Sequence, residues 1–464
     1  MIAVSIDIGS TWTKGAVFRR DGQGLALDRR IAVPTTTDDL SRAFSRVLDG
    51  LVDGGDAASR VRRGEVRLSY SSSAKGGLAV AALGLVPEIT LESARVAAYS
   101  AGAKVTRVFS YRLTRSDIRS LEAAPPDILL FAGGTDGGHV DSILANAEAL
   151  ARSSLDCSIV YAGNRALADD VSDLLAGKDL VQVPNVLPSI NAPDPDPARE
   201  AIRKIFLSKI VKGKGLDVIV GETGVEPLPT PYSVYEFARL ISARVPGWSD
   251  FILLDMGGAT TDVYSAHRER PAPGTILRGL PEPEVKRTVE GDLGLRVSAE
   301  AASDAVKGLV ADALDRREER IAAFADYIAR VSAAPDYLPE DEDGQAFDAI
   351  LAGACVAEAC GRHAGRAAEV YTPEGKLKLQ TGRDLTGVTR VIGSGGWLSR
   401  TASFDPSPWF RRMGVDNRGR AVLLPAEISY FRDEHYVFPL LANVARDFPE
   451  EAAKAGIDML VAQQ

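Results

Sequence analysis

Cysteine is scarce in this sequence. Its 464 residues include only three cysteines, at positions 157, 355 and 360, which is too few for a disulfide framework. Cys355 and Cys360 are five residues apart, which is not the spacing of a metal-binding pair. We therefore expect buried, reduced cysteines and a cytoplasmic location.

Long apolar runs and an excess of positive charge are also absent. No apolar stretch is long enough to cross a bilayer. The first residues, Met1–Asp7, have a strand pattern and lack the basic region and cleavage site of a signal peptide. The chain has 54 basic and 63 acidic residues, a net charge of -9. Nucleic-acid binding needs clustered Lys and Arg, so we expect neither nucleic acid nor a membrane as partner.

The remaining composition is that of a soluble globular protein with a substantial core. Hydrophobic residues make up 45% of the chain and charged residues 25%. A chain of 464 residues is too long for one ordinary domain. We therefore expect two to four structural units.

The N-terminal stretch reads as strand, tight turn, strand, strand and helix. Residues 2–8 form the first strand, 14–19 resume an extended pattern after the turn, and 25–33 form a third strand. We expect this unit to occupy residues 1–64 and to be completed by residues 191–250, which include a strand at 217–220.

Short apolar strands alternate with helical segments between residues 65 and 190. The expected strands include Val66–Tyr70, Val105–Tyr111, Ile128–Ala132 and Ile159–Ala162, and a helix is expected through Ala79–Leu83. Repeated βα units predict a parallel sheet with helices on both faces. We interpret this segment as an inserted flavodoxin-like α/β domain, which ends at a proline-rich exit.

The strand–turn–strand pattern restarts at Phe251–Asp255 and opens a C-terminal unit that we assign to residues 251–464. Within it, 298–370 has an almost wholly helical pattern, Val391-Ile392 forms a core strand, and a helix is expected near 449–462.

One short motif occurs twice. Asp7-x-Gly9-Ser10-x-x-Thr13 matches Asp255-x-Gly257-Gly258-x-x-Thr261, and each copy joins two strands. Glycines at such turns let the backbone approach a phosphate group, and consecutive N–H groups form an anion-binding concavity. Two copies predict two half-domains that grip a nucleotide across a cleft. The expected binding residues are Gly9, Ser10, Thr11, Thr13, Lys14, Gly257, Gly258, Ala259, Thr260 and Thr261.

The aspartates of the motif have a different expected role. Asp7 and Asp255 cannot bind phosphate directly, because like charges repel. Each can hold Mg²⁺, through water, or orient an attacking water, so both are candidate catalytic and metal-binding residues. Asp262, on the strand that leaves the second turn, is a further candidate, or a simple strand residue.

A later glycine-rich turn supports a nucleotide site. Gly393-Ser394-Gly395-Gly396 follows the strand Val391-Ile392, and its glycines would let an adenosine lie against the backbone. It lacks the full G-x-G-x-x-G pattern of dinucleotide-binding turns. We expect Gly393, Ser394, Gly395 and Gly396 to form an adenosine loop.

These motifs together resemble the actin/Hsp70/sugar-kinase superfamily and, more narrowly, the glutamate mutase accessory family, called MutL or GlmL. The resemblance covers nearly the whole chain in order. It rests on the segments Asp7–Lys14, Ser71–Leu78, Phe131–Gly138, Leu254–Val263, Thr288–Gly294, Arg362–Arg366 and Val391–Gly396. It implies a two-lobed actin-like (ribonuclease H-like) ATPase fold.

The resemblance also implies a role beside an adenosylcobalamin-dependent carbon-skeleton mutase. Members look like reactivating factors that use ATP and Mg²⁺ to help a mutase discard damaged cobalamin, so cobalamin enters only through the partner. Direct cobalt ligation by His139 is not expected, because Asp136-x-x-His139 has the wrong spacing for the usual motif. A small-molecule kinase and a non-catalytic ATP-binding protein stay open as alternatives, as does a homo-oligomer.

Overall fold

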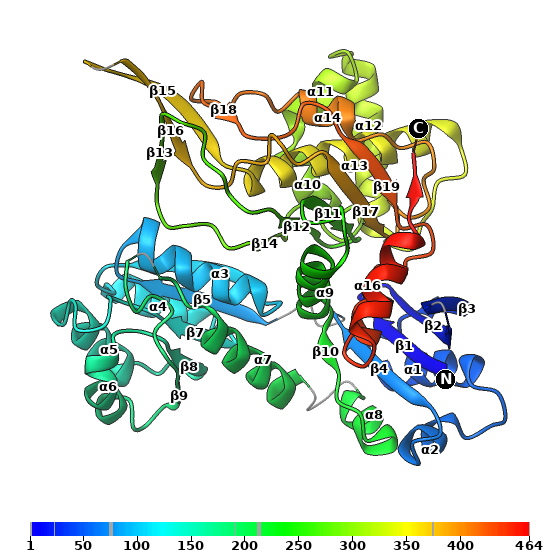
Figure 1. Ribbon diagram of the computed structural model, residues 1–464, viewed down its shortest axis with the longest axis horizontal. Helices are drawn as coiled ribbons and strands as arrows, with labels where there is room; N and C mark the ends of the chain where they lie inside the picture. The colour runs from blue at the N-terminus through cyan, green and yellow to red at the C-terminus, as the bar shows by residue number, and fades with distance from the viewer. Residues whose placement is uncertain are drawn as a thin grey trace.

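The computed structural model describes residues 2–22, 24–73, 78–190, 192–210, 215–373 and 375–463. The described strands form four sheets, and helices cover the larger ones (Figure 1). The chain is therefore an α/β protein. Along these described ranges, no helix is both long enough and apolar enough to pass through a membrane.

The N-terminal sheet has the strand order β10-β4-β1-β2-β3. The first three strands in sequence pair antiparallel, whereas β4 and β10 add to the sheet in parallel. The strands are β1 (Ile2–Ile8), β2 (Trp12–Asp21), β3 (Gly24–Pro34), β4 (Arg67–Ser72) and β10 (Leu228–Pro229).

Both faces of this sheet are covered, because alternate residues of β1 point to different helices. Ile6 packs in one core with Phe44 of α1, whereas Ala3 packs in another with Phe438 of α15. The helices on the first face are α1 (Leu40–Leu51), α2 (Ala57–Arg62) and α8 (Leu216–Thr223). Those on the second face are α9 (Thr230–Arg244), α15 (Phe438–Val444) and α16 (Pro449–Asp458).

The C-terminal lobe contains a sheet with the order β14-β12-β11-β17-β19-β20. Its first three strands pair antiparallel, and the next two add in parallel. The strands are β11 (Phe251–Met256), β12 (Thr261–Ala266), β14 (Val285–Glu290), β17 (Arg390–Gly395), β19 (Ser429–Arg432) and β20 (Val461–Ala462). Apart from β20, this repeats the strand order and directions of the N-terminal sheet. The repeat gives the two half-domains that the two motifs predicted, in the two-lobed actin-like (ribonuclease H-like) fold that the family resemblance implied.

A third sheet, with the order β6-β5-β7-β8-β9, is parallel throughout. In sequence terms this is the order 2-1-3-4-5, the flavodoxin-like arrangement. Its strands are β5 (Ala79–Gly84), β6 (Lys104–Ser110), β7 (Ile128–Phe131), β8 (Ser158–Tyr161) and β9 (Asp179–Gln182). Its helices are α3 (Glu92–Ser100) and α7 (Asp196–Ile210) on one face, and α4 (Arg115–Ala123), α5 (Asp141–Arg152) and α6 (Ala168–Leu174) on the other. Short helical turns lie at η1 (Pro87–Leu91) and η2 (Arg165–Leu167).

Three sequence expectations about secondary structure are wrong. The strand expected at Val66–Tyr70 exists as β4, but it pairs with β1 and not with the flavodoxin-like sheet. Ala79–Leu83 is a strand and not a helix, because burial on both faces selects small side chains there and overrides their helix propensity. Residues 217–220 belong to helix α8, in which Leu216 and Ile219 share the buried face. The division of the chain at residues 64, 190 and 250 stays a prediction.

The rest of the C-terminal half is a group of helices and a small sheet. The helices are α10 (Ala299–Ala305), α11 (Lys307–Ala313), α12 (Glu318–Ala333), α13 (Glu342–His363) and α14 (Ser407–Arg411). The small sheet contains β13 (Thr275–Arg278), β15 (Arg366–Thr372), β16 (Gly375–Thr381) and β18 (Ala421–Val422). The helical pattern at 298–370 therefore ends at His363, and the helix expected near 449–462 ends at Asp458.

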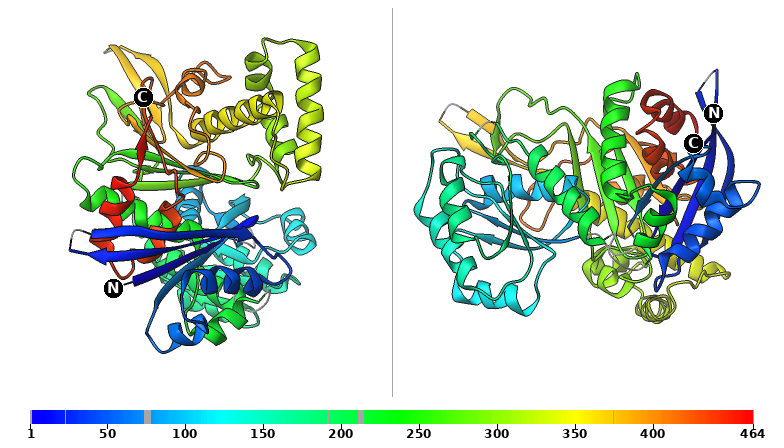
Figure 2. Two further views of the ribbon diagram at one scale, coloured as in Figure 1. Left: turned by 90° about the vertical axis from the view of Figure 1, so that its right-hand side faces the viewer. Right: turned by 90° about the horizontal axis from the view of Figure 1, so that it is seen from below.

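The two lobes share one hydrophobic core. Phe18 of the N-terminal sheet and Tyr264 of the C-terminal sheet pack with Phe237 of α9 and Phe438 of α15. Helix α9 leads from the first lobe to the second, and α15 lies beside it (Figure 2). These two helices therefore join the lobes. The turns that carry the two motifs face each other between the lobes.

Candidate active site

The first motif is a tight β-hairpin turn. The N–H of Gly9 donates to the carbonyl of Trp12 at 3.1 Å and closes the turn between β1 and β2. A Cβ on Gly9 would lie 2.7 Å from that carbonyl oxygen, so glycine is required. In the strand pair, Asp7 lies opposite Lys14.

The second motif has the same geometry. The N–H of Gly257 donates to the carbonyl of Thr260 at 2.9 Å, and Asp255 lies opposite Asp262. The position that holds Lys14 in the first hairpin therefore holds Asp262 in the second. The two hairpins match in backbone but carry opposite charge at this one position.

A single cavity, here called the interlobe cavity, lies between the two hairpins. A Cβ on Gly258 would lie 3.7 Å from the Thr11 hydroxyl, so the two turns approach each other closely. The predicted residues that line the cavity are Gly9, Ser10, Thr11, Lys14, Asp255, Gly257, Gly258, Ala259, Thr260, Gly395 and Gly396. Sequence reasoning thus located the residues of both turns that meet in space.

Two of the threonines that were predicted to bind nucleotide use their hydroxyls in hydrogen bonds outside the cavity. The Thr13 hydroxyl lies 2.9 Å from that of Thr35, which in turn donates to the Gly9 carbonyl at 2.8 Å. The Thr261 hydroxyl donates to the carbonyl of Leu293 at 2.5 Å. Both threonines are buried and hold the hairpins in place, and neither lines the cavity.

The predicted adenosine loop divides into two parts. Gly393 and Ser394 lie within β17 and do not line the cavity. The Ser394 hydroxyl donates to Asp433 at 2.8 Å, and a Cβ on Gly393 would collide with the ring of Tyr430. Gly395 and Gly396 do reach the cavity, and Gly395 has a φ of +102°, which favours glycine.

Asp7 lies beneath the cavity and not in its wall. Its carboxylate accepts hydrogen bonds from the hydroxyls of Thr230 at 2.6 Å, Tyr436 at 3.1 Å and Ser71 at 3.2 Å. Tyr436 lines the cavity, and the Nζ of Lys14 lies 3.3 Å from the centre of its ring. Asp7 is 1% exposed, so it acts first as an anchor for the side chains above it.

Asp255, unlike Asp7, lines the cavity, as does Asp262. Burial, and then the neighbouring Asp262, raise the pKa of Asp255 to about 7, although Lys14 acts in the opposite direction. Burial also lowers the pKa of the Lys14 ammonium, against the pull of Asp7 and Asp255. A carboxylate that titrates near neutral pH is suited to exchange a proton with water.

Arg287 of β14 connects the cavity to the flavodoxin-like domain. Its guanidinium lies 2.5 Å from the carboxylate of Asp262 and donates to the carbonyls of Tyr99 at 2.6 Å and Ala103 at 3.3 Å. Lys104, the first residue of β6, also lines the cavity. One wall of the cavity therefore includes Gly102 and Lys104, which lie where α3 leads into the inserted sheet.

The cavity continues into an apolar pocket on the C-terminal side. Gly257, Gly258 and Gly396 belong to both. The additional lining residues are Arg30, Ala32, Leu295, Arg296, Pro335, Asp336, Leu338, Trp397 and Arg400. Arg296 fixes this wall, because it makes a bidentate ion pair with Asp348 at 2.7 and 2.9 Å. A flat aromatic base could lie in such a pocket.

Several residues of the site carried no motif. Thr230, Arg287, Trp397 and Tyr436 come from scattered elements, and only their packing brings them to the cavity. Trp397 directly follows the Gly-rich turn, which is the one signal that could have identified it. In the segment Ser71–Leu78, which contributes to the family resemblance, residues 74–77 lie outside the described residues.

Two comparisons concern the whole sequence. The family model described as MutL protein matches residues 3–459. Protein MutL of Clostridium tetanomorphum is 35% identical over 462 residues, which is 97% of each chain.

Solved structures give distant matches. Nucleotide-free acetone carboxylase has a TM-score of 0.38 at 11% identity, covering 96% of this chain and 70% of that one. The activator of 2-hydroxyisocaproyl-CoA dehydratase from Clostridium difficile, with bound ADPNP, has a TM-score of 0.30 at 10% identity, covering 99% and 97%. The fold assignment therefore rests on the repeated sheet topology, and the family assignment rests on sequence. The chain belongs to the MutL family, the glutamate mutase accessory family that its motifs resemble.

Proposed function

We propose that this chain binds ATP with Mg²⁺ in the interlobe cavity and hydrolyses it as a reactivating factor for an adenosylcobalamin-dependent carbon-skeleton mutase, such as glutamate mutase. The observation that supports ATP binding most strongly is the pair of matched hairpin turns that face one cavity, with an apolar pocket at its end. Family membership supports the mutase as partner.

Different parts of the cavity suit the phosphates, the ribose and the adenine of ATP. The N–H groups of Gly9 and Gly257 close the turns, and the backbone N–H groups of residues 10–11 and 258–260 line the cavity, where they suit phosphate oxygens. Lys14 supplies a positive charge between the two hairpins. The pocket beside Trp397 and Leu338 suits the adenine, and Gly395 and Gly396 suit the ribose.

The acidic residues suit Mg²⁺ that arrives with the nucleotide. Among the described residues, no group of three or more His, Cys, Asp or Glu side chains forms a metal site. Asp255 and Asp262, which lie opposite each other in the second hairpin, are the two carboxylates that line the cavity. Mg²⁺ typically keeps several waters and binds one or two carboxylates plus phosphate oxygens, so this donor set fits it. The ion would neutralise charge on the phosphate oxygens and would be held through its own waters near Asp255 and Asp262, with Asp7 acting only through the groups above it.

Asp255 is the residue that we assign to water activation. It lies in the cavity wall, and its raised pKa lets it accept a proton near neutral pH. Asp7 holds Thr230 and Tyr436 in place, and Lys14 lies over the Tyr436 ring. Asp7 is therefore a positioning residue, and Asp255 the proposed catalytic residue.

A small-molecule kinase is the second candidate. The cavity extends past the two turns to Lys104 and Arg287, where an anionic acceptor could bind beside the terminal phosphate. A screen of metabolites with γ-labelled ATP separates the two functions. Label transfer to a metabolite selects the kinase, whereas release of free phosphate selects the ATPase.

Rescue of an inactivated mutase tests the proposed role. A mutase inhibited by bound cyanocobalamin is incubated with this protein, ATP, Mg²⁺ and adenosylcobalamin. We expect activity to return with the wild-type protein and ATP. The Asp255→Asn protein is the matched control and should not restore activity. Equal recovery without ATP, or with Asp255→Asn, would contradict the proposal.

A further inference from the structure

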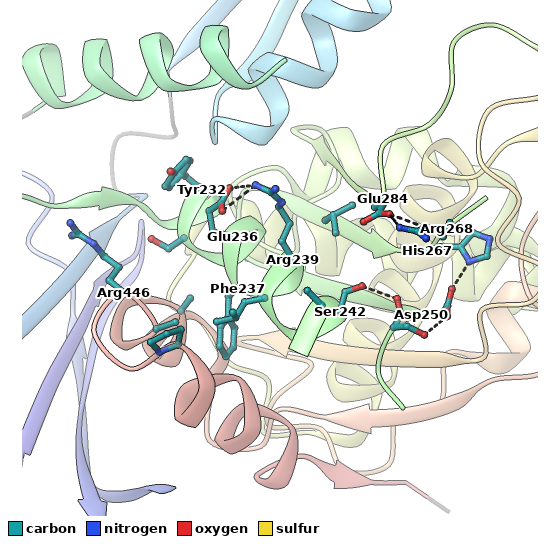
Figure 3. A pocket seen from close by; sticks show the side chains of 18 of the residues that line it. Tyr232, Glu236, Phe237, Arg239, Ser242, Asp250, His267, Arg268, Glu284 and Arg446 are labelled. Carbon is teal, nitrogen blue, oxygen red and sulfur yellow. Dashed lines mark hydrogen bonds and ion pairs between the residues drawn. The ribbon is translucent and has the colours of Figure 1, made fainter. Parts of the chain in front are cut away.

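A second cavity, here called the α9 groove, begins beside the first. Thr230 and Pro231 at the start of α9 line the interlobe cavity, whereas Tyr232 and Ser233, the next two residues, line the groove. Figure 3 shows Tyr232, Glu236 and Arg239 along one side of α9, facing the groove. The two cavities therefore share the first turn of one helix.

The groove is rich in arginine, although the whole chain has a net charge of -9. Three carboxylates, of Glu236, Asp250 and Glu284, line it. They are outnumbered by five arginines, at positions 203, 239, 268, 270 and 446.

Two of these arginines have no acidic partner among the described residues, so their guanidinium groups are available to a ligand. Arg239 pairs with Glu236 at 3.2 Å, and Arg268 pairs with Glu284. Arg270 and Arg446, by contrast, make no ion pair with any carboxylate in the part of the chain that the structure describes. A groove with two spare guanidinium groups favours a ligand that carries carboxylates.

A buried hydroxyl adds an independent reason to expect a ligand. Ser233 lines the groove and is 2% exposed, and its Oγ has no hydrogen-bond partner among the described residues. A buried hydroxyl without a partner costs free energy, and a ligand carboxylate that accepts a hydrogen bond from it would remove that cost. Apolar side chains, Phe237 and Val285 among them, complete the lining.

The walls of the groove come from several parts of the molecule. Arg203 belongs to α7, Arg446 follows α15, and His267 and Arg268 follow β12. Figure 3 shows Arg446 at one end of the groove, with Arg268 and Glu284 at the other. The cavity volume is about 900 Å³, far larger than a single small anion needs. An elongated ligand with carboxylates at intervals would fit this distribution of charge.

We propose that the α9 groove is a docking site for an acidic segment of a partner protein. The segment would place carboxylates against Arg270, Arg446 and the Ser233 hydroxyl. Its apolar side chains would pack on Leu240. This inference does not depend on ATP binding, because the groove is separate from the interlobe cavity.

Binding of a labelled peptide to the full-length protein tests the proposal. The probe is a ten-residue fluorescein peptide of alternating Glu and Leu, followed by fluorescence anisotropy without nucleotide. We expect saturable binding, and a loss of about tenfold or more in affinity for Arg270→Glu/Arg446→Glu. The matched control is Arg152→Glu on α5, an exposed arginine outside the groove, which should bind like the wild type.

Other outcomes would overturn the proposal. Equal binding by the double variant and the wild type would place the peptide elsewhere. Equal competition by inorganic phosphate or by an oligothymidylate of similar charge would show a general anion site instead of a peptide site. The neutral pair Arg270→Ala/Arg446→Ala, with an unchanged melting temperature, guards against a folding defect and should also lose affinity.

Discussion

At the scale of single residues, Asp255 is distinguished from Asp7 by its surroundings. The two aspartates hold equivalent positions in matched hairpins, yet Asp7 accepts hydrogen bonds from the hydroxyls of Ser71, Thr230 and Tyr436. Asp255 instead lies near Asp262 and has a pKa raised to about 7. The two aspartates therefore occupy equivalent sequence positions but have different chemical surroundings.

Asp255→Asn is expected to lower the rate of ATP hydrolysis by about 100-fold or more, because an amide cannot accept the proton of the attacking water. In the wild type the rate should rise with pH around 7, as Asp255 loses its proton. Steady-state phosphate release between pH 5.5 and 9 measures both effects. Unimpaired hydrolysis by Asp255→Asn would remove it from the catalytic role, provided that the variant keeps its melting temperature.

The raised pKa of Asp255 also leads to a prediction about the stability of the folded protein. Its pKa in the folded protein, about 7, lies above the ordinary value of 3.8, so the folded state binds more protons between these values. The contribution of Asp255 to stability must therefore fall as the pH rises from about 4 to 7. Asp255→Asn removes this penalty and should raise the free energy of unfolding at pH 8 by on the order of 1–3 kcal/mol. Urea unfolding at pH 5 and pH 8 measures the difference, which should be smaller at pH 5.

At the scale of elements, the hairpin turns depend on their glycines. A Cβ on Gly9 would lie 2.7 Å from the Trp12 carbonyl, so Gly9→Ala should open the turn. We expect a loss of about 1–3 kcal/mol in stability and about tenfold in ATP affinity. Gly177→Ala is the matched control, because nothing lies within 4 Å of its added methyl group. Thermal unfolding and nucleotide titration of both variants distinguish a local effect from a general one.

The sequence alone predicted the structural features that depend on local sequence pattern. The turns at Gly9 and Gly257 were identified because their glycines are required by the backbone itself. The strand at Ala79–Leu83 was missed because its small residues reflect helices packed on both sides, which no local pattern reveals. Arg287 and Tyr436 were missed for the same reason, since only tertiary packing brings them to the cavity.

At the scale of the whole molecule, Arg287 joins the nucleotide cavity to the inserted domain. Its side chain contacts Asp262 and two backbone carbonyls at the end of α3. If ATP changes the position of Asp262, helix α3 should respond. Hydrogen exchange of residues 92–104 should therefore differ between the ATP-bound and free wild-type protein. Arg287→Lys should reduce that difference, because an ammonium is a point charge without the planar fork that reaches Asp262 and both carbonyls.

Helix α9 connects the interlobe cavity to the α9 groove. Its first residues line the interlobe cavity and the following ones line the α9 groove. A non-hydrolysable ATP analogue should therefore change the affinity of the groove for the acidic peptide, by about threefold or more if the lobes rotate about this helix. Identical peptide affinity with and without the analogue would leave the two sites independent.

Photolabelling with 8-azido-ATP tests the central claim most directly, because it reports where the base of the nucleotide lies. The azide on the adenine should label peptides that contain residues 335–338 or Trp397, and unlabelled ATP should prevent the reaction. Labelling should be strongly reduced in Gly9→Ala, in which the phosphate-binding turn is disturbed. Labelling confined to other peptides, such as those of the α9 groove, would contradict the assignment of the interlobe cavity as the ATP site.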